Sequence, residues 1–199
     1  YLTKAAKDNA IVDCIKTAHA KNQPVLVGTS SIELSEELNE RLAAEGITAN
    51  VLNAKNDELE AEIIKEAGRP GTVTISANMS GRGVDIKLGG ADESQKDEAV
   101  AAGGLLILGT FMSESERGDM QLRGRSGRQG DVGESRFIIS LEDEIMTKYE
   151  LKKLIPKRHY PTAETGRPID DKIVLREVDR IQRIAQGDTL ELRKRLLKF

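Results

Sequence analysis

The sequence predicts an α/β protein: a parallel sheet with helices on both of its faces, followed by a linker and a long C-terminal helix. Over the first 145 residues, short apolar or β-branched runs alternate with segments whose apolar residues recur every three or four positions. The run at residues 25–27 is continuously apolar, as in a strand buried on both faces, and strands separated by helices form parallel sheets. Strands are expected at residues 25–27, 49–52, 72–77, 105–108 and 136–141.

Helical spacing predicts three of the segments around these strands. The first helix is expected at residues 5–20. Ser30 and Glu33 predict a capping box for the second, which Gly46 should end as a C-terminal cap. A third helix is expected at residues 57–67.

The C-terminal part has a different pattern. Residues 149–168 contain three prolines and predict a linker. Apolar residues then return to helical spacing and predict a long last helix, in which Gly187-Asp188 is a candidate site for a break. We therefore expect two domains, at residues 1–148 and 149–199. The apolar stripe of the last helix comprises Ile169, Ile173, Val178, Ile181 and Ile184.

The composition excludes several classes of protein. Hydrophobic residues make up 38% and charged residues 32% of the 199, as in globular domains. No apolar run has the length of a membrane span and no signal peptide opens the chain, so membrane contact is expected to be peripheral. The single cysteine, Cys14, favours a reducing, cytosolic setting. Two distant histidines predict no metal site.

The charge is unevenly distributed. Residues 1–150 hold 17 Lys and Arg against 26 Asp and Glu, whereas residues 151–199 hold 13 against 7. An acidic body is a poor surface for a nucleic acid. The basic tail is open to two interpretations, a solvated helix face or a surface that binds an acidic partner or anionic lipid.

The first motif, residues 78–85, follows a predicted strand and reads Asn-Met-Ser-Gly-Arg-Gly-Val-Asp. Gly81 and Gly83 let the backbone turn tightly beside a ligand. Asp85 can accept a hydrogen bond from a ribose hydroxyl or orient a water near phosphate. Arg82 can pair with Asp85, with phosphate, or with neither. The alternative is a structural turn held by a salt bridge.

The second motif, residues 121–131, places three arginines within six residues of an otherwise acidic region. Such a cluster needs a compensating anion, and a guanidinium can bind two phosphate oxygens at once. Arg125 and Arg128 are three residues apart and would face the same way on one helical turn. In phosphoryl transfer, an arginine finger from a facing domain accelerates the reaction by roughly 10³–10⁵. The alternative is a solvated basic loop.

The phosphate-binding sequence GxxxxGK[ST] does not occur in the chain. The chain therefore has candidate fingers without a loop to hold the phosphates. We expect it to bind nucleotide weakly and to hydrolyse none by itself. An arrangement with both arginines in ion pairs away from the strand ends, and with Asp85 buried elsewhere, would contradict this interpretation.

Both motifs resemble motifs V and VI of superfamily 2 helicases, and their wording resembles the SecA family of protein translocases along essentially the whole chain. The matching strings are QPVLVGT, NVLNAK, NMSGRG, DIKLGG, GGLLILGT, QLRGRSGRQGD and SLED, in the family's order. The segment Leu192 to Leu197 resembles the start of the family's helical scaffold. Ser76, Ser80, Val84 and residues 111–120 depart from the usual pattern, which suggests an accessory-type paralogue.

The resemblance implies a fold, a site and partners. The fold is RecA-like, and residues 1–148 correspond to the second motor domain of an ATPase that pushes preproteins through the SecY channel. ATP lies between two motor domains, and Mg²⁺ is held mainly by the first, which this chain lacks. Asp85, Gly81, Gly83 and Arg82 would shape the nucleotide side, Gln121 would order the γ-phosphate side, and Arg125 and Arg128 would be the fingers.

Two rival functions remain open from the sequence. A helicase half-domain shares the architecture and the arginine spacing, but needs a basic surface along a nucleic-acid strand. A non-catalytic docking module would use the basic C-terminal helix alone. DNA- or RNA-stimulated ATPase activity favours the first, and an ATPase rate that is insensitive to both arginines favours the second.

Overall fold

A computed structural model describes residues 1–52, 57–77 and 85–196 of the chain. It divides into two compact units. The sheet unit comprises residues Ile11–Phe111 and Gln121–Phe137, and the helical unit comprises Tyr1–Ala10, Met112–Met120 and Ile138–Phe199. The functional division after residue 148 stays a prediction, because these units group residues by spatial contact alone.

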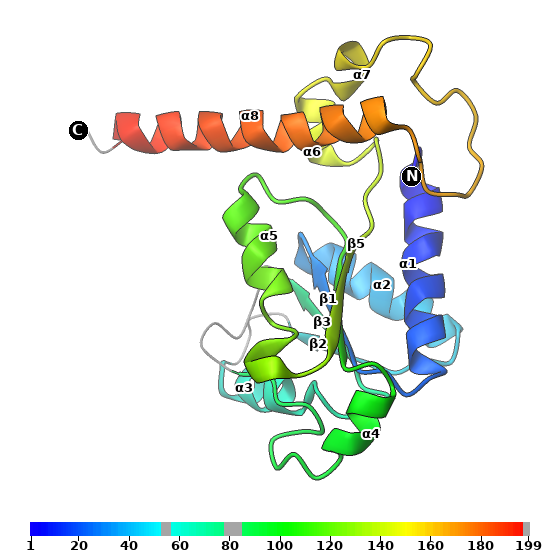
Figure 1. Cartoon of the computed structure of the whole chain (residues 1–199), viewed down its shortest axis with the longest axis vertical. Helices are drawn as coiled ribbons and strands as arrows, with labels where there is room; N and C mark the ends of the chain where they lie inside the picture. The colour runs from blue at the N-terminus through cyan, green and yellow to red at the C-terminus, as the bar shows by residue number, and fades with distance from the viewer. Residues whose placement is uncertain (53–56, 78–84, 197–199) are drawn as a thin grey trace. The chain divides into compact units, whose positions relative to one another are not determined.

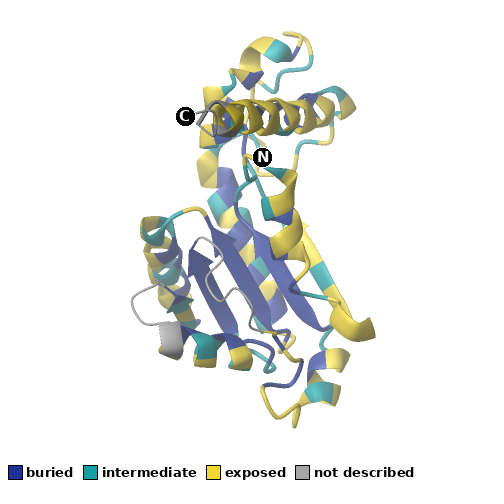
Figure 2. Cartoon of the chain, turned by 90° about the vertical axis from the view of Figure 1, so that its left-hand side faces the viewer, coloured by how far each residue is buried: buried dark blue, intermediate teal, exposed yellow. Residues whose placement is uncertain are grey.

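The sheet unit contains five parallel strands in the order β2-β3-β1-β4-β5, which confirms the predicted fold class. Every residue of β1, β3 and β4 is buried, whereas β5 forms a largely exposed edge (Figure 2). The strands are β1 Val25–Thr29, β2 Ala49–Leu52, β3 Val73–Ala77, β4 Leu105–Gly109 and β5 Gly133–Phe137.

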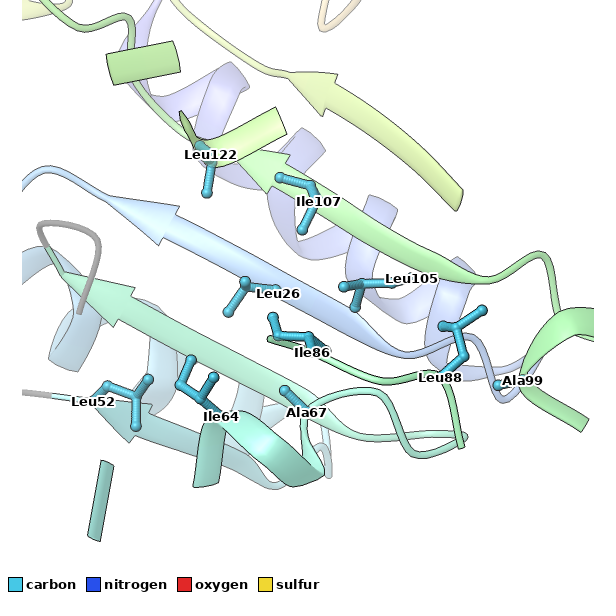
Figure 3. Packing of buried hydrophobic residues seen from close by; sticks show 10 residues of the cluster. All are labelled: Leu26, Leu52, Ile64, Ala67, Ile86, Leu88, Ala99, Leu105, Ile107 and Leu122. Atoms are coloured by element: carbon cyan, nitrogen blue, oxygen red, sulfur yellow. The ribbon is translucent and has the colours of Figure 1, made fainter. Parts of the chain in front are cut away.

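Helices lie on both faces of this sheet. Figure 1 shows α2 on one side and α3 on the other, and the part of α1 that belongs to the sheet unit lies on the side of α2. Side chains that point to the α3 face form one apolar cluster, which includes Leu26, Ile86 and Ile107 (Figure 3). The helices up to β5 are α1 Lys4–His19, α2 Ile32–Ala44, α3 Asp57–Glu66, α4 Lys96–Ala101 and α5 Glu116–Arg123.

The ends of α2 illustrate how local sequence sets the fold. The predicted capping box at Ser30 is wrong by one residue, because the N-cap is Ser31, whose hydroxyl accepts a hydrogen bond from the Leu34 amide at 3.2 Å. The predicted C-terminal cap is confirmed. Gly46 has a φ of +76°, and its amide and that of Ile47 donate to carbonyls in the last turn.

The predicted strand at residues 136–141 is wrong in its position, because β5 ends at Phe137. The apolar residues that suggested the later strand, Ile139 and Leu141, belong to the core of the helical unit. An edge strand has a neighbour on one side only and needs no continuous apolar run.

In the helical unit, two short helices and one long helix pack around that second core. These helices are α6 Glu144–Lys148, α7 Leu151–Leu154 and α8 Lys172–Leu196. α8 runs through Gly187 without a break, so the interruption left open there is absent. Its most buried apolar side chains are Val174, Val178, Ile181 and Ala185, and Ile184 is 37% exposed. The predicted stripe is therefore correct only in part.

None of the helices in residues 1–52, 57–77 and 85–196 combines the length and the apolar character needed to cross a membrane.

Candidate functional site

The first motif lies mostly outside the described residues. Gly81, Arg82 and Gly83 follow β3 but fall in the segment 78–84, so their roles stay predictions. Asp85 is the first described residue after that segment, and it is exposed. Ile86, directly beside it, is 7% exposed and packs into the sheet core, which anchors the backbone at Asp85 (Figure 3).

The second motif begins in the last turn of α5 and reaches Asp85. Arg128 donates from Nη1 to Oδ1 of Asp85 at 2.7 Å, and the two residues are 43 positions apart in sequence. Its Nε donates to the carbonyl oxygen of Gly124 at 2.6 Å. Both side chains of the pair remain more than 40% exposed, so the pair can be reached from solvent.

Arg125 lies in the same group of charges but is buried, with 7% of its surface exposed. Burial lowers the pKa of its guanidinium, and the positive charge of Arg128 lowers it further, whereas Asp85 acts in the opposite direction. The two predicted fingers and the predicted nucleotide aspartate therefore interact electrostatically.

The arginines do not share a helical turn, so the geometry suggested by their spacing is wrong. α5 ends at Arg123, and Arg128 starts a separate short 3-10 turn. Between and beside them the backbone turns left-handed, with φ of +66° at Gly127 and +53° at Gln129. The nearness of Arg125 and Arg128 is produced by this turn.

The position of the motif relative to the strands also differs from the expectation. Open parallel sheets bind ligands beyond the carboxyl ends of their strands, but Ser126 donates from Oγ to the carbonyl of Leu105, the first residue of β4, at 2.6 Å. A crossover helix returns antiparallel to the preceding strand, so the end of α5 lies beside the start of β4. The contradicting arrangement is nevertheless not met in full, because Asp85 is exposed and is itself the partner of Arg128.

Gln121 is exposed on α5, and its predicted role at the γ-phosphate stays a prediction. The end of the motif is fixed by Asp131, which pairs with Lys96 of α4 at 3.0 Å; this hydrogen bond raises the pKa of the lysine.

Sequence reasoning missed two residues that hold the motif. Ser126 binds the β4 backbone as described above, and Arg123 lies over the ring of Phe137, with its Cζ 4.6 Å from the ring centroid. A serine between two glycine-flanked arginines was a usable signal for an anchoring role, whereas the Arg123–Phe137 contact depends on tertiary structure.

The side chains of the two motifs are of types that can contact a nucleotide. Guanidinium groups bind phosphate, and the Asp85 carboxylate accepts hydrogen bonds as a ribose site requires. Within the described ranges, no group of three or more His, Cys, Asp and Glu side chains is placed to hold a metal ion.

The chain is similar over its whole length to known proteins. A family model described as "SecA P-loop domain" matches residues 1–100 and 91–157. The protein translocase subunit SecA of Nitrosococcus oceani is 46% identical over 222 residues, covering 100% of this chain and 25% of that protein. Those of Sulfurovum sp. and Chlorobium luteolum are each 48% identical over 199 residues, covering all of this chain and 22% and 19% of the relatives. The chain thus spans a quarter or less of the length of these three relatives.

Proposed function

The chain belongs to the SecA family, and from this premise we propose that it is the second motor domain, with the start of the helical scaffold, of a SecA-type ATPase. The complete protein would drive preproteins through the SecY channel. In it, residues 1–148 would complete an ATP site whose phosphate-binding loop belongs to the first motor domain, and residues 149–199 would be the linker and the scaffold start.

One observation carries this proposal: the ion pair between Arg128 and Asp85 at 2.7 Å. It joins the aspartate of the first motif to an arginine of the second across 43 residues of sequence. Both members remain exposed, so a ligand from outside the chain can compete for them. A structural salt bridge would gain nothing from this exposure, because exposed ion pairs contribute little to stability.

The proposed chemistry assigns one task to each group. ATP supplies the phosphoryl group, with Mg²⁺ held mainly by the first motor domain. The guanidinium of Arg128 would leave Asp85 and bind γ-phosphate oxygens, where negative charge develops during transfer. Asp85 would then accept a hydrogen bond from the nucleotide. Arg125 would add positive charge beside Arg128, while Gly81, Gly83, Arg82 and Gln121 would shape the surrounding surface.

The family also suggests partners and a location. We propose that the complete protein is cytoplasmic and associates peripherally with the inner face of the cell membrane. Its partners would be its own first motor domain, the SecY channel and preproteins, with anionic lipids as a further partner of the basic C-terminal region. The acidic balance of residues 1–150 supports the exclusion of nucleic acids.

Restoring the first motor domain, in cis or in trans, tests the proposal. The chain alone should show no ATP hydrolysis, because it lacks the GxxxxGK[ST] loop. The restored protein should hydrolyse ATP, and Arg128→Ala should lower that rate at least about tenfold. Arg167→Ala, which removes an exposed arginine of the irregular 155–171 segment, is the matched control and should leave the rate unchanged.

Three results would contradict the proposal. Substantial turnover by the chain alone would show that it holds its own phosphate site. An unchanged rate in both Arg125→Ala and Arg128→Ala would favour a docking module. Stimulation of the restored protein by DNA or RNA would favour a helicase.

A further inference from the structure

We propose that Arg123 is a positioning residue of the nucleotide site, which stacks on Phe137 and so fixes the backbone that orients Arg128. This inference rests on the proposed function. The sequence contains three arginines at 123, 125 and 128. The latter two interact electrostatically with Asp85, whereas Arg123 contacts an aromatic ring.

The ring of Phe137 has a fixed place. Phe137 is the last residue of β5 and pairs in register with Gly109 of β4. A Cβ atom built at Gly109 would lie 2.5 Å from Cε1 of the ring, which is closer than real contacts allow. The ring therefore lies directly over Gly109, and it also packs against the sheet core. These two contacts make Phe137 a rigid support.

Arg123 uses this support. Its Cζ lies 4.6 Å from the ring centroid, within the range of a cation–π contact. A planar guanidinium stacks on an aromatic face as well as it pairs with anions, and a lysine cannot reproduce that stacking. Because Arg123 is the last residue of α5, the contact fixes the end of the helix against β5.

The peptide after Arg123 then orients Arg128. The carbonyl oxygen of Gly124 accepts a hydrogen bond from Nε of Arg128 at 2.6 Å. Within the described part of the chain, the guanidinium of Arg128 is held by this hydrogen bond and by the ion pair with Asp85. Once ATP replaces Asp85 as its partner, the Gly124 carbonyl is the contact that remains. Displacement of Arg123 would move this carbonyl and misdirect Arg128.

The experiment uses the full-length protein and measures ATP hydrolysis over a range of ATP concentrations. Arg123→Ala and Phe137→Leu should each lower kcat about tenfold, with KM for ATP within about twofold, since neither side chain touches the nucleotide. The double variant should be no slower than either single variant, because both remove one contact. Phe137→Tyr keeps the ring and should retain the original kcat.

Controls separate this role from folding and from the proposed function. Thermal unfolding checks that each variant folds. If Arg123→Ala does not fold, Arg123→Lys takes its place in the test; it keeps the charge but not the stacking, and should also lower kcat. A normal kcat for Phe137→Leu with a raised KM for Arg123→Ala would overturn the inference, since Arg123 would then bind ATP directly. Normal kcat in both variants, with a slow Arg128→Ala, would overturn it while leaving the proposed function intact. A normal Arg128→Ala would contradict the proposed function itself.

Discussion

Two ion pairs of the molecule have nearly the same length and opposite environments. In the helical unit, Lys7 donates to Asp143 at 2.6 Å, and each side chain is 9% exposed. In the sheet unit, Arg128 donates to Asp85 at 2.7 Å, and the side chains are 44% and 42% exposed. Each pair joins residues that are far apart in sequence.

The two aspartates also differ in their other contacts. Asp143 accepts further hydrogen bonds from the hydroxyl and the amide of Ser140, at 2.7 and 3.1 Å. The buried carboxylate is thus compensated within the protein. Replacing its partners would leave its negative charge buried, where water cannot solvate it. The exposed pair has water as a ready substitute on both sides. The buried pair is thus held within the protein, whereas the exposed pair is accessible to a ligand.

The largest effect is expected at the buried pair. Asp143→Ala should lower the free energy of unfolding by about 3–5 kcal/mol, because it leaves Lys7 without this carboxylate in a buried place. Urea unfolding of the chain measures this change. Asp170→Ala, which removes an exposed aspartate of the irregular 155–171 segment, is the control. A loss below about 1 kcal/mol would break the comparison.

A smaller effect is expected at the second partner of that carboxylate. Ser140→Ala removes the hydroxyl group that donates to Asp143 at 2.7 Å, while the hydrogen bond from the Ser140 backbone amide to Asp143 remains. Hydrogen bonds to charged groups contribute about 1.5–3 kcal/mol, so the free energy of unfolding should fall by that amount. If Ser140→Ala equals Asp143→Ala, the hydroxyl and not the ion pair determines the effect.

Buried polar groups that lack a partner should behave in the opposite way. Within the described residues, the hydroxyls of Thr74 and Ser76 on β3 are buried without a hydrogen-bond partner. Thr74→Val removes such a hydroxyl at nearly constant shape, and should raise the free energy of unfolding by about 1 kcal/mol. A clear destabilisation would show that the Thr74 hydroxyl has a hydrogen-bond partner. It would also weaken the use of hydrogen-bond partners to identify the polar groups that stabilise the fold.

The smallest effect on stability is expected at the exposed pair. Arg128→Ala should change the free energy of unfolding by less than about 1 kcal/mol, because water replaces both partners. Asp85→Ala should give a similarly small change. A loss near that of Asp143→Ala would assign the Arg128 pair to the structure and not to a ligand.

The sequence predicted the interior of the sheet better than its margin. β2 was placed at its observed bounds, 49–52. β1 and β4 were found from their continuous apolar runs, and β3 from its β-branched and apolar residues. β5 was misplaced, because the edge sequence Gly-Glu-Ser-Arg-Phe carries no such run. The stripe of α8 was also only partly right, since small Ala185 is buried where larger Ile184 is not.

The sequence indicated which side chains to compare at the candidate site, but it did not predict their geometry. Residue types alone indicated Asp85 and Arg128, which the structure brings together. Helical spacing failed for Arg125 and Arg128 because α5 ends at Arg123 and Gly127, with its positive φ, lies between the two arginines. The stacking of Arg123 on Phe137 depends on how β5 pairs with β4, which no local pattern encodes.

One pair of measurements tests the central claim, that the exposed pair serves a nucleotide and the buried pair serves the fold. With the first motor domain restored, ATP hydrolysis and thermal unfolding are recorded for Arg128→Ala on the same preparation. We predict an ATPase rate at least about tenfold lower with the unfolding midpoint nearly unchanged. An unaltered rate, or a rate that falls only in step with the unfolding midpoint, would contradict the account.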